Sequence, residues 1–350
     1  MCRCEKNALF ISQAEPAPQA HVCRSLLRRL QGFAMTDEKP KAVLIIGATA
    51  SGKSALALDV AERFGGVIIN ADSMQVYAEL RIITNRPTPA EEARAPHRLY
   101  GFRPAREPYS TALWLADVAR EVADAEARGL LPVIVGGTGL YFKALTEGLS
   151  TIPEIPAEIR AHYRLRAETE PAEALHAELS RRDAATAATI RPSDPQRIAR
   201  ALEVLEATGR PLADWHAQKE PPLLSAADAL PVVVEIDRAA LYRRCDERFD
   251  RMIEAGAIEE ARAIDALHLD AALPAMRAVG LPPLIAFARG EVSLGDAAER
   301  AKTATRNYAK RQLTWIRNNF ISRNDCFTKE MQGTKSEINL FVRKRLTAFH

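Results

Sequence analysis

The most specific chemistry in this 350-residue chain lies in one glycine-rich segment. It runs Gly47-Ala48-Thr49-Ala50-Ser51-Gly52-Lys53-Ser54 and matches the phosphate-loop pattern G-x-x-x-x-G-K-[ST] in full. In such a loop the backbone N–H groups cradle phosphate oxygens, the lysine adds a positive charge, and the serine hydroxyl binds Mg²⁺. The segment therefore predicts a polyphosphate site, the alternative being a glycine turn that binds nothing.

A carboxylate follows the next strand-like run. Residues 67–69 lead through Asn70 and Ala71 into Asp72, which is followed by Ser73, Met74 and Gln75. This places Asp72 at the carboxyl edge of a predicted sheet, beside the phosphate loop. There it is a candidate general base or Mg²⁺ ligand. The alternative without a function is a turn or helix cap.

A hydroxyl flanked by glycines ends the third strand-like run. Residues 131–135 continue into Gly136-Gly137-Thr138-Gly139, where many ATPases carry a metal-binding aspartate. Glycines allow substrate backbone or phosphate to approach closely, which makes Thr138 a candidate functional residue. A glycine-rich turn alone is the alternative.

A basic strip lies near the end of the chain. Residues 300–323 contain seven basic side chains and no Asp or Glu: Arg300, Lys302, Arg306, Lys310, Arg311, Arg317 and Arg323. An acidic partner such as nucleic acid would neutralise the strip, whereas a solvated helix face is the alternative.

The elements that position these residues alternate between strand and helix. Short β-branched runs predict strands at residues 43–46, 67–69, 131–135 and 232–236. Ala- and Leu-rich patterns predict helices at residues 54–64 and from the N-cap Ser110 to about Arg128, where Gly129 closes the helix. This alternation predicts an α/β fold with a parallel sheet and a ligand site at the strands' carboxyl ends.

The pattern divides the chain into segments. Residues 41–148 and 222–320 are predicted to form the α/β core with C-terminal helices, and the Pro-punctuated, Ala-rich residues 149–221 a helical insertion domain. Residues 1–40 are predicted to be a disordered extension, with 1–34 outside the folded protein, and residues 321–350 a C-terminal tail.

The composition, 47% hydrophobic and 27% charged, is that of a globular protein. No apolar run reaches the roughly eighteen residues of a membrane helix, so we expect no membrane association. Five scattered cysteines supply neither a disulfide framework nor a zinc site, which favours a reducing cytoplasm. A net charge of +3 says little about partners.

Seven ordered motifs across about residues 40–320 resemble the tRNA dimethylallyltransferases, also called tRNA isopentenyltransferases, of the bacterial type. The motifs are residues 47–54, 72–77, 96–99, 135–142, 194–197 with 200–203, 277–280 and 310–315. The resemblance implies a P-loop NTPase-like sheet and transfer of the dimethylallyl group of dimethylallyl diphosphate to the exocyclic amine of adenosine 37 in tRNA. It also implies Mg²⁺ as cofactor, and we expect a monomer.

The resemblance assigns roles residue by residue. It implies Asp72 and Thr138 as catalytic residues, with Mg²⁺ on Ser54 and an open role for Asp72 as base or metal ligand. It implies diphosphate binding by Gly47, Thr49, Ala50, Ser51, Gly52, Lys53, Ser54 and Arg277. It implies tRNA binding by Asp72, Ser73, Met74, Gln75, Arg160, Asp194, Gln196, Arg197, Arg200, Lys310, Arg311 and Gln312.

Three segments depart from the family pattern. Ala48 replaces a proline, which only restricts φ, so we expect phosphate binding to persist. The usual Gly-Thr-Ala-Lys-Pro segment becomes residues 83–87, which keep Thr84 and a positive charge at Arg86. Residues 281–283, Leu-Pro-Pro, replace a tyrosine and a basic residue, which puts one substrate contact in doubt.

Other motif residues have structural interpretations. Ile198, Ala201, Leu202 and Leu205 have helical spacing and predict a packed face. Trp315 is predicted to pack in the interior rather than stack on a base, and His97 to be a positioning hydrogen-bond donor. For Arg160 a solvated helix arginine remains the alternative.

Two other function classes compete with prenyl transfer. A nucleotide or small-molecule kinase would use the same phosphate loop for ATP. A non-catalytic RNA-binding module would need neither a phosphate cradle nor a carboxylate beside it.

Overall fold

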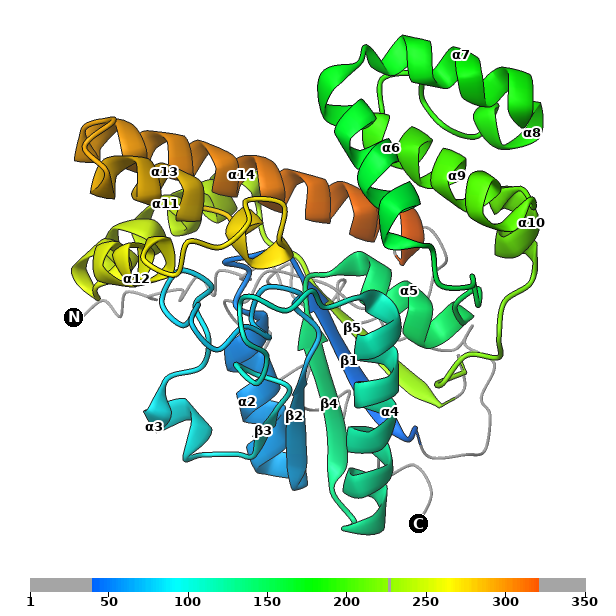
Figure 1. Cartoon of the computed structure of the whole chain (residues 1–350). Helices are drawn as coiled ribbons and strands as arrows, with labels where there is room; N and C mark the ends of the chain where they lie inside the picture. Colours follow the sequence, from blue (N-terminus) through cyan, green and yellow to red (C-terminus); the bar gives the residue numbers. More distant parts are fainter. Residues whose placement is uncertain (1–39, 226–227, 321–350) are drawn as a thin grey trace, which may run out of the picture. The chain divides into compact units, whose positions relative to one another are not determined.

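The computed structural model describes residues 40–225 and 228–320. Five parallel strands form one sheet in the order β3-β2-β4-β1-β5 (Figure 1). They are β1 (Ala42–Gly47), β2 (Gly66–Asn70), β3 (His97–Arg98), β4 (Leu131–Gly136) and β5 (Ala229–Val234). This order places β1 beside β4, so the loops that follow these two strands meet at the carboxyl edge. The predicted α/β fold is confirmed.

Both faces of the sheet are buried at its centre because β1, β4 and β5 are apolar at every position. In β1, Val43 and Ile45 pack toward helix α2 (Lys53–Phe64), while Leu44 and Ile46 pack on the opposite face. That second face is covered by α4 (Thr111–Ala127) and α5 (Gly139–Glu147). Alternate residues of a strand point to opposite faces, which explains the three layers seen in Figure 1.

The helix ends follow the sequence signals. Ser110 Oγ accepts a hydrogen bond from Leu113 N at 3.2 Å and caps α4, as predicted. β5 ends two residues earlier than predicted. The sequence did not predict β3, because two residues are too few to show a period. The short helix α3 (Pro89–Glu92) precedes it.

The segment between α5 and β5 forms helices around a separate hydrophobic cluster. These are α6 (Ala157–Thr169), α7 (Ala172–Arg182), α8 (Ala184–Ala187), α9 (Pro195–Thr208) and α10 (Leu212–Ala217). Ile198, Ala201 and Leu202 are buried in this cluster as predicted, whereas Leu205 is half-buried. The insertion therefore has an apolar core of its own.

The chain continues from β5 into a group of helices. These are α11 (Arg238–Glu254), α12 (Ala257–Asp265), the 3-10 helix η1 (Pro274–Arg277), α13 (Leu281–Ala288) and α14 (Leu294–Asn319). Helix α14 contacts β1 and α5 and crosses the carboxyl edge of the sheet (Figure 1). The unusual Leu281-Pro282-Pro283 opens α13 after Gly280, whose φ is +95°, and proline is compatible with a first helical turn.

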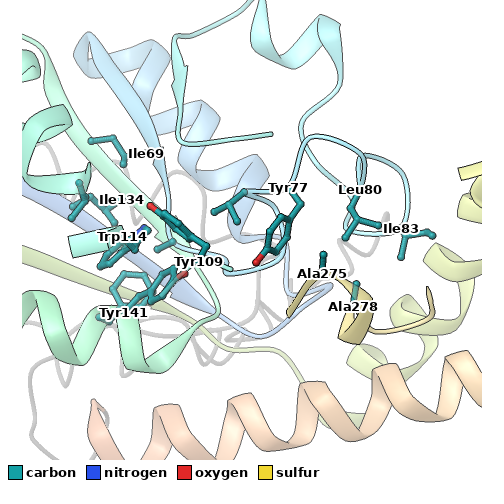
Figure 2. Close-up of a cluster of buried hydrophobic side chains, with 14 of the residues drawn as sticks. Ile69, Tyr77, Leu80, Ile83, Tyr109, Trp114, Ile134, Tyr141, Ala275 and Ala278 are labelled. Atoms are coloured by element: carbon teal, nitrogen blue, oxygen red, sulfur yellow. The ribbon is translucent and has the colours of Figure 1, made fainter. Parts of the chain in front are cut away.

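Aromatic and aliphatic side chains fill the space between the sheet edge and η1. Tyr77, Leu80 and Ile83 face Ala275 and Ala278 (Figure 2). This packing supports the segment that follows Asp72.

None of the helices in the described part of the chain has the length and apolar character needed to cross a bilayer. The predictions for residues 1–39 and 321–350 lie outside the described residues.

Candidate functional site

The phosphate loop joins β1 to α2 through two residues with positive φ. Ala50 has φ +61° and Gly52 has φ +95°, and Ser51 N donates to Ala48 O at 3.2 Å. Ala48, which stands where the family has proline, is fully buried beside Leu241 and Leu313 of α11 and α14. Alanine therefore packs here without disturbing the loop.

A cavity of about 230 Å³ opens beside this loop. Six of the predicted site residues line this cavity. They come from the loops after β1 and β2, from η1 and from α14. They are Thr49, Asp72, Ser73, Met74, Arg277 and Arg311. Ile83, Phe249 and Met252 give the same cavity an apolar wall. The site thus combines positive charge, one carboxylate and an apolar surface.

Asp72 is held by its own turn and by Asn70. The buried Asn70 accepts from Asp72 N at 2.8 Å, and its Nδ2 donates to Asp72 O at 2.9 Å. Asp72 Oδ1 accepts from Met74 N at 2.9 Å. These bonds fix the carboxylate at the cavity while engaging one of its oxygens.

Thr138 supports the site from its rim. It occupies the N-cap position of α5 but makes no side-chain cap there. Instead its Oγ1 accepts from Ser73 N at 3.0 Å, and its side chain hydrogen-bonds with Tyr308 of α14. Thr138 therefore joins the loop of Asp72 to α14 and does not itself line the cavity.

Two half-buried cations lie near Asp72. Burial lowers the pKa of Lys53 from 10.5 to about 8; Asp72 opposes this shift and Arg248 adds to it. Lys53 Nζ donates to Ala48 O at 3.3 Å. Burial also lowers the pKa of Arg248, whose Nη2 donates to Thr49 Oγ1 at 2.5 Å. Two desolvated cations beside one carboxylate form a site for an anion.

Arg248 was missed in the sequence, although a signal existed. In α11 it follows Leu241 and Cys245 and precedes Met252 at helical spacing, so it is a cation within an apolar stripe. Charges on a buried face need a partner, and Arg248 projects into the cavity. Its Nε is buried without a hydrogen bond among the described residues.

The loop that carries Gln75 is braced internally. Gln75 Nε2 donates to Thr84 O and Asn85 O, both at 2.9 Å. Arg86, which retains the positive charge of the family segment, donates to Tyr77 O at 3.0 Å and lies against Gly101, where an added Cβ would come within 1.8 Å of its guanidinium. The Arg86 charge thus supports the loop.

Most predicted tRNA contacts of the insertion gather at the start of α9. Asp194 caps this helix by accepting from Arg197 N at 3.1 Å. Gln196 and Arg197 are exposed, and Arg200 pairs with the buried Glu203 at 2.6 Å. Arg160, half-buried on α6, makes a long hydrogen bond to Ile155 O. None of these predicted tRNA contacts lines the cavity.

The structure shows that part of the basic strip is engaged in ion pairs within the protein. Lys302 and Arg306 form ion pairs with Asp250 and Asp246 of α11, both at 2.7 Å, so they join two helices and are already neutralised. Lys310, Arg311 and Arg317 are exposed. Arg300, near the start of the helix, is exposed as well, and Arg323 lies outside the described residues. Most of the available positive charge on α14 therefore lies on its second half.

Gln312 is not on that exposed surface. It is 6% exposed, and its amide accepts from Thr49 N and donates to Gly137 O. The side chain therefore points into the protein and away from the exposed face of α14, and the tRNA contact expected of Gln312 stays a prediction. Trp315 packs against Gly139, where an added Cβ would lie 2.3 Å from the indole, and the predicted interior packing is confirmed.

Ser54 lies apart from the main cavity. Its exposed side chain borders a smaller cavity with His97 and Tyr100, and His97 Nδ1 lies 2.8 Å from Ala95 O. Within the residues that the structure describes, His, Cys, Asp and Glu form no group of three that could hold a metal ion.

Comparison with known proteins agrees with this arrangement. A family model described as IPP transferase matches residues 75–319, and one described as isopentenyl transferase matches residues 40–102. A tRNA dimethylallyltransferase of Nitrobacter hamburgensis is 57% identical over 79% of this chain and 87% of its own. A tRNA dimethylallyltransferase of Rhodopseudomonas palustris is 55% identical over 80% of this chain and 87% of its own.

Solved structures give the same result. The full-length tRNA isopentenylpyrophosphate transferase of Bacillus halodurans has a TM-score of 0.62 and 31% identity, covering 89% of this chain and 98% of that one. A eukaryotic dimethylallyltransferase acting on tRNA has a TM-score of 0.73 and 26% identity, covering 87% of this chain and 77% of that one. From the family match over residues 75–319 and these identities, we conclude that the chain belongs to the IPP transferase family.

Proposed function

We propose that the protein transfers the dimethylallyl group of dimethylallyl diphosphate to the exocyclic amine of adenosine 37 in tRNA and releases diphosphate. One observation carries the proposal. The cavity beside the phosphate loop places the Asp72 carboxylate together with Arg248, Arg277 and an apolar wall. These are the groups needed by an anionic leaving group, a hydrocarbon chain and an amine that must lose a proton.

The leaving group is assigned to the phosphate loop and its cations. Diphosphate gains negative charge as the carbon–oxygen bond breaks, and preorganised N–H groups and cations lower the energy of that charge. Lys53 and Arg248 are already desolvated, so they interact strongly with the developing charge. Arg277, exposed at the end of η1, lines the same cavity and adds a further positive charge.

Mg²⁺ belongs to the proposal as a shared ligand of protein and substrate. Mg²⁺ commonly binds through few protein oxygens and several phosphate and water oxygens, which fits the exposed Ser54 hydroxyl at the start of α2. When bound, the ion would add positive charge at the diphosphate oxygens.

The amine proton is assigned to Asp72. Met74 N engages Oδ1, which orients the carboxylate and leaves its second oxygen to accept a proton from the attacking amine. Thr138 keeps the Asp72 loop in place through Ser73 N. Attack then needs only the alignment of amine, carbon and leaving oxygen.

The acceptor base must leave the anticodon loop to reach this cavity. Recognition of single-stranded RNA uses splayed bases, and enzymes that modify a base take it out of its stack. Lys310 and Arg311 on α14, with Gln196 and Arg197 on the insertion, are the proposed contacts to the tRNA backbone.

We also propose that the protein is a cytoplasmic monomer, in keeping with the buried free thiol of Cys245.

The test separates prenyl transfer from the kinase alternative. Wild-type protein is incubated with unmodified tRNA and dimethylallyl diphosphate labelled in the prenyl group, and the nucleosides are then analysed. We expect label on adenosine and none when guanosine replaces adenosine 37. Phosphoryl transfer from labelled ATP, with no label in the tRNA, would instead establish the kinase.

A further inference from the structure

We propose that Gln312 is a positioning residue that fixes the phosphate loop relative to the turn that carries Thr138. The inference rests on the proposed function, because these two segments are assigned to the leaving group and to support of the base. Its basis is one buried side chain that bridges both segments.

The bridge uses both ends of the Gln312 amide. Oε1 accepts from Thr49 N at 2.8 Å, and Nε2 donates to Gly137 O at 2.9 Å. Thr49 belongs to the loop after β1 and Gly137 to the turn after β4. A single planar amide therefore sets the spacing between two neighbouring loops at the carboxyl edge.

The site is built for this amide. Gly137 has no side chain, and a Cβ there would lie 2.2 Å from Gln312 Nε2. The side chain of Gln312 is buried, so loss of either bond would leave a backbone group unpaired in the interior. Tyr308, one turn earlier in α14, hydrogen-bonds with the side chains of both Gln312 and Thr138.

The same loop is held from a second direction. Arg248 donates to Thr49 Oγ1, so Thr49 is fixed at its hydroxyl by α11 and at its N–H by α14. Thr138 in turn holds Ser73 N, the residue after Asp72. Gln312 thus connects the leaving-group side of the cavity to the base side, although it does not itself line the cavity.

Such a connection matters because the reaction requires alignment. A misplacement of about 1 Å between reacting groups can lower a rate about a hundredfold while binding changes little. We therefore expect loss of the bridge to lower kcat and to leave the affinity for tRNA nearly unchanged.

Two variants separate the halves of the bridge. Gln312→Glu keeps an acceptor for Thr49 N but places a carboxylate oxygen against Gly137 O. Gln312→Met keeps the approximate volume and removes both bonds. Thr314→Ala, on the exposed side of α14, is the control because its hydroxyl only bonds back to Lys310 O.

We expect kcat for prenyl transfer to fall at least about tenfold in both Gln312 variants, with tRNA affinity within about twofold of wild type. Hydrogen exchange of the Thr49 amide should accelerate in Gln312→Met and stay slow in Gln312→Glu. Thr314→Ala should match wild type in every measurement.

Wild-type kcat in both Gln312 variants would overturn the inference, as would unchanged Thr49 exchange in Gln312→Met. Equal losses of kcat and tRNA affinity would assign Gln312 to tRNA binding instead. If wild type itself transfers no prenyl group, the proposed function fails, and the exchange rates of Thr49 still decide whether Gln312 holds the loop.

Discussion

The carboxylate of Asp72 has two oxygens with different surroundings. Oδ1 accepts from Met74 N, and an asparagine at this position keeps an acceptor for that bond. Asp72→Asn should therefore preserve the loop but lower turnover by roughly two to four orders of magnitude, since the amide cannot take up the proton. Single-turnover kinetics with labelled dimethylallyl diphosphate measure the loss.

Inorganic diphosphate distinguishes a base from a metal ligand in the same variant. If Asp72 is the base, calorimetry should give wild-type affinity at every Mg²⁺ concentration. A loss of affinity that excess Mg²⁺ restores would assign Asp72 to the metal.

Lys53 makes diphosphate binding depend on pH. Burial lowers its pKa from 10.5 to about 8, so the free protein loses this charge above about pH 8. A bound anion favours the charged form and raises the pKa. Above about pH 8, binding of diphosphate therefore takes up a proton, and the affinity for diphosphate falls as the pH rises. Below about pH 8, Lys53 is charged in both the free and the diphosphate-bound protein, so it contributes no pH dependence.

Titration of Lys53→Arg with inorganic diphosphate is the matched control. Arginine stays charged throughout this pH range, so the ionisation of diphosphate is then the remaining source of pH dependence. Identical pH profiles for wild type and variant would contradict the role given to Lys53.

The sequence predicted those site residues that belong to contiguous motifs. The phosphate loop and Asp72 follow strands, so their positions could be inferred before any contact was known. Arg248 and Gln312 could not be placed in the same way. Their partners lie 199 and 263 positions away, and helical spacing alone does not say what a buried polar side chain will meet.

At the scale of the element, α14 has two halves with different roles. Lys310 is exposed, whereas Lys302 is paired with Asp250. Lys310→Ala should weaken tRNA binding and lower the slope of log affinity against log salt by up to about one. Filter binding across a salt series gives the slope.

Lys302→Ala provides the comparison on the same helix. Because its charge is already neutralised by α11, this variant should leave the salt slope unchanged. Equal slopes for Lys310→Ala and wild type would assign the exposed half of α14 to a solvated face.

The elements themselves were largely predictable. Four strands, the capped α4 and the helical insertion follow from periodicity and from Ser110 and Gly129. The exception, β3, forms because residues 97–98 pair with Ile68 and Ile69 of β2. Such a short strand depends on tertiary pairing, which local propensity does not encode.

At the scale of the whole molecule, the insertion has its own apolar core. Leu175 is fully buried there, and Leu175→Ala should lower the free energy of unfolding by about 2–5 kcal/mol. We expect weaker tRNA binding, because Gln196 and Arg197 lie on this part. Affinity for inorganic diphosphate should stay unchanged at temperatures where the insertion alone loosens.

Calorimetry and binding at increasing temperature test this separation. One transition with simultaneous loss of tRNA and diphosphate binding would contradict it. Two transitions, with diphosphate retained through the first, would support the predicted domain boundaries near residues 149 and 221.

The Thr49–Gln312 bridge also has a consequence for synthesis on the ribosome. Chains emerge from the N-terminus, and the two residues joined by this bond are 263 positions apart. Strands β1, β2 and β4 can pair while α14 is still inside the exit tunnel, but the phosphate loop gains its final support only when Gln312 emerges. A nascent chain can therefore have a folded sheet well before it has a competent site.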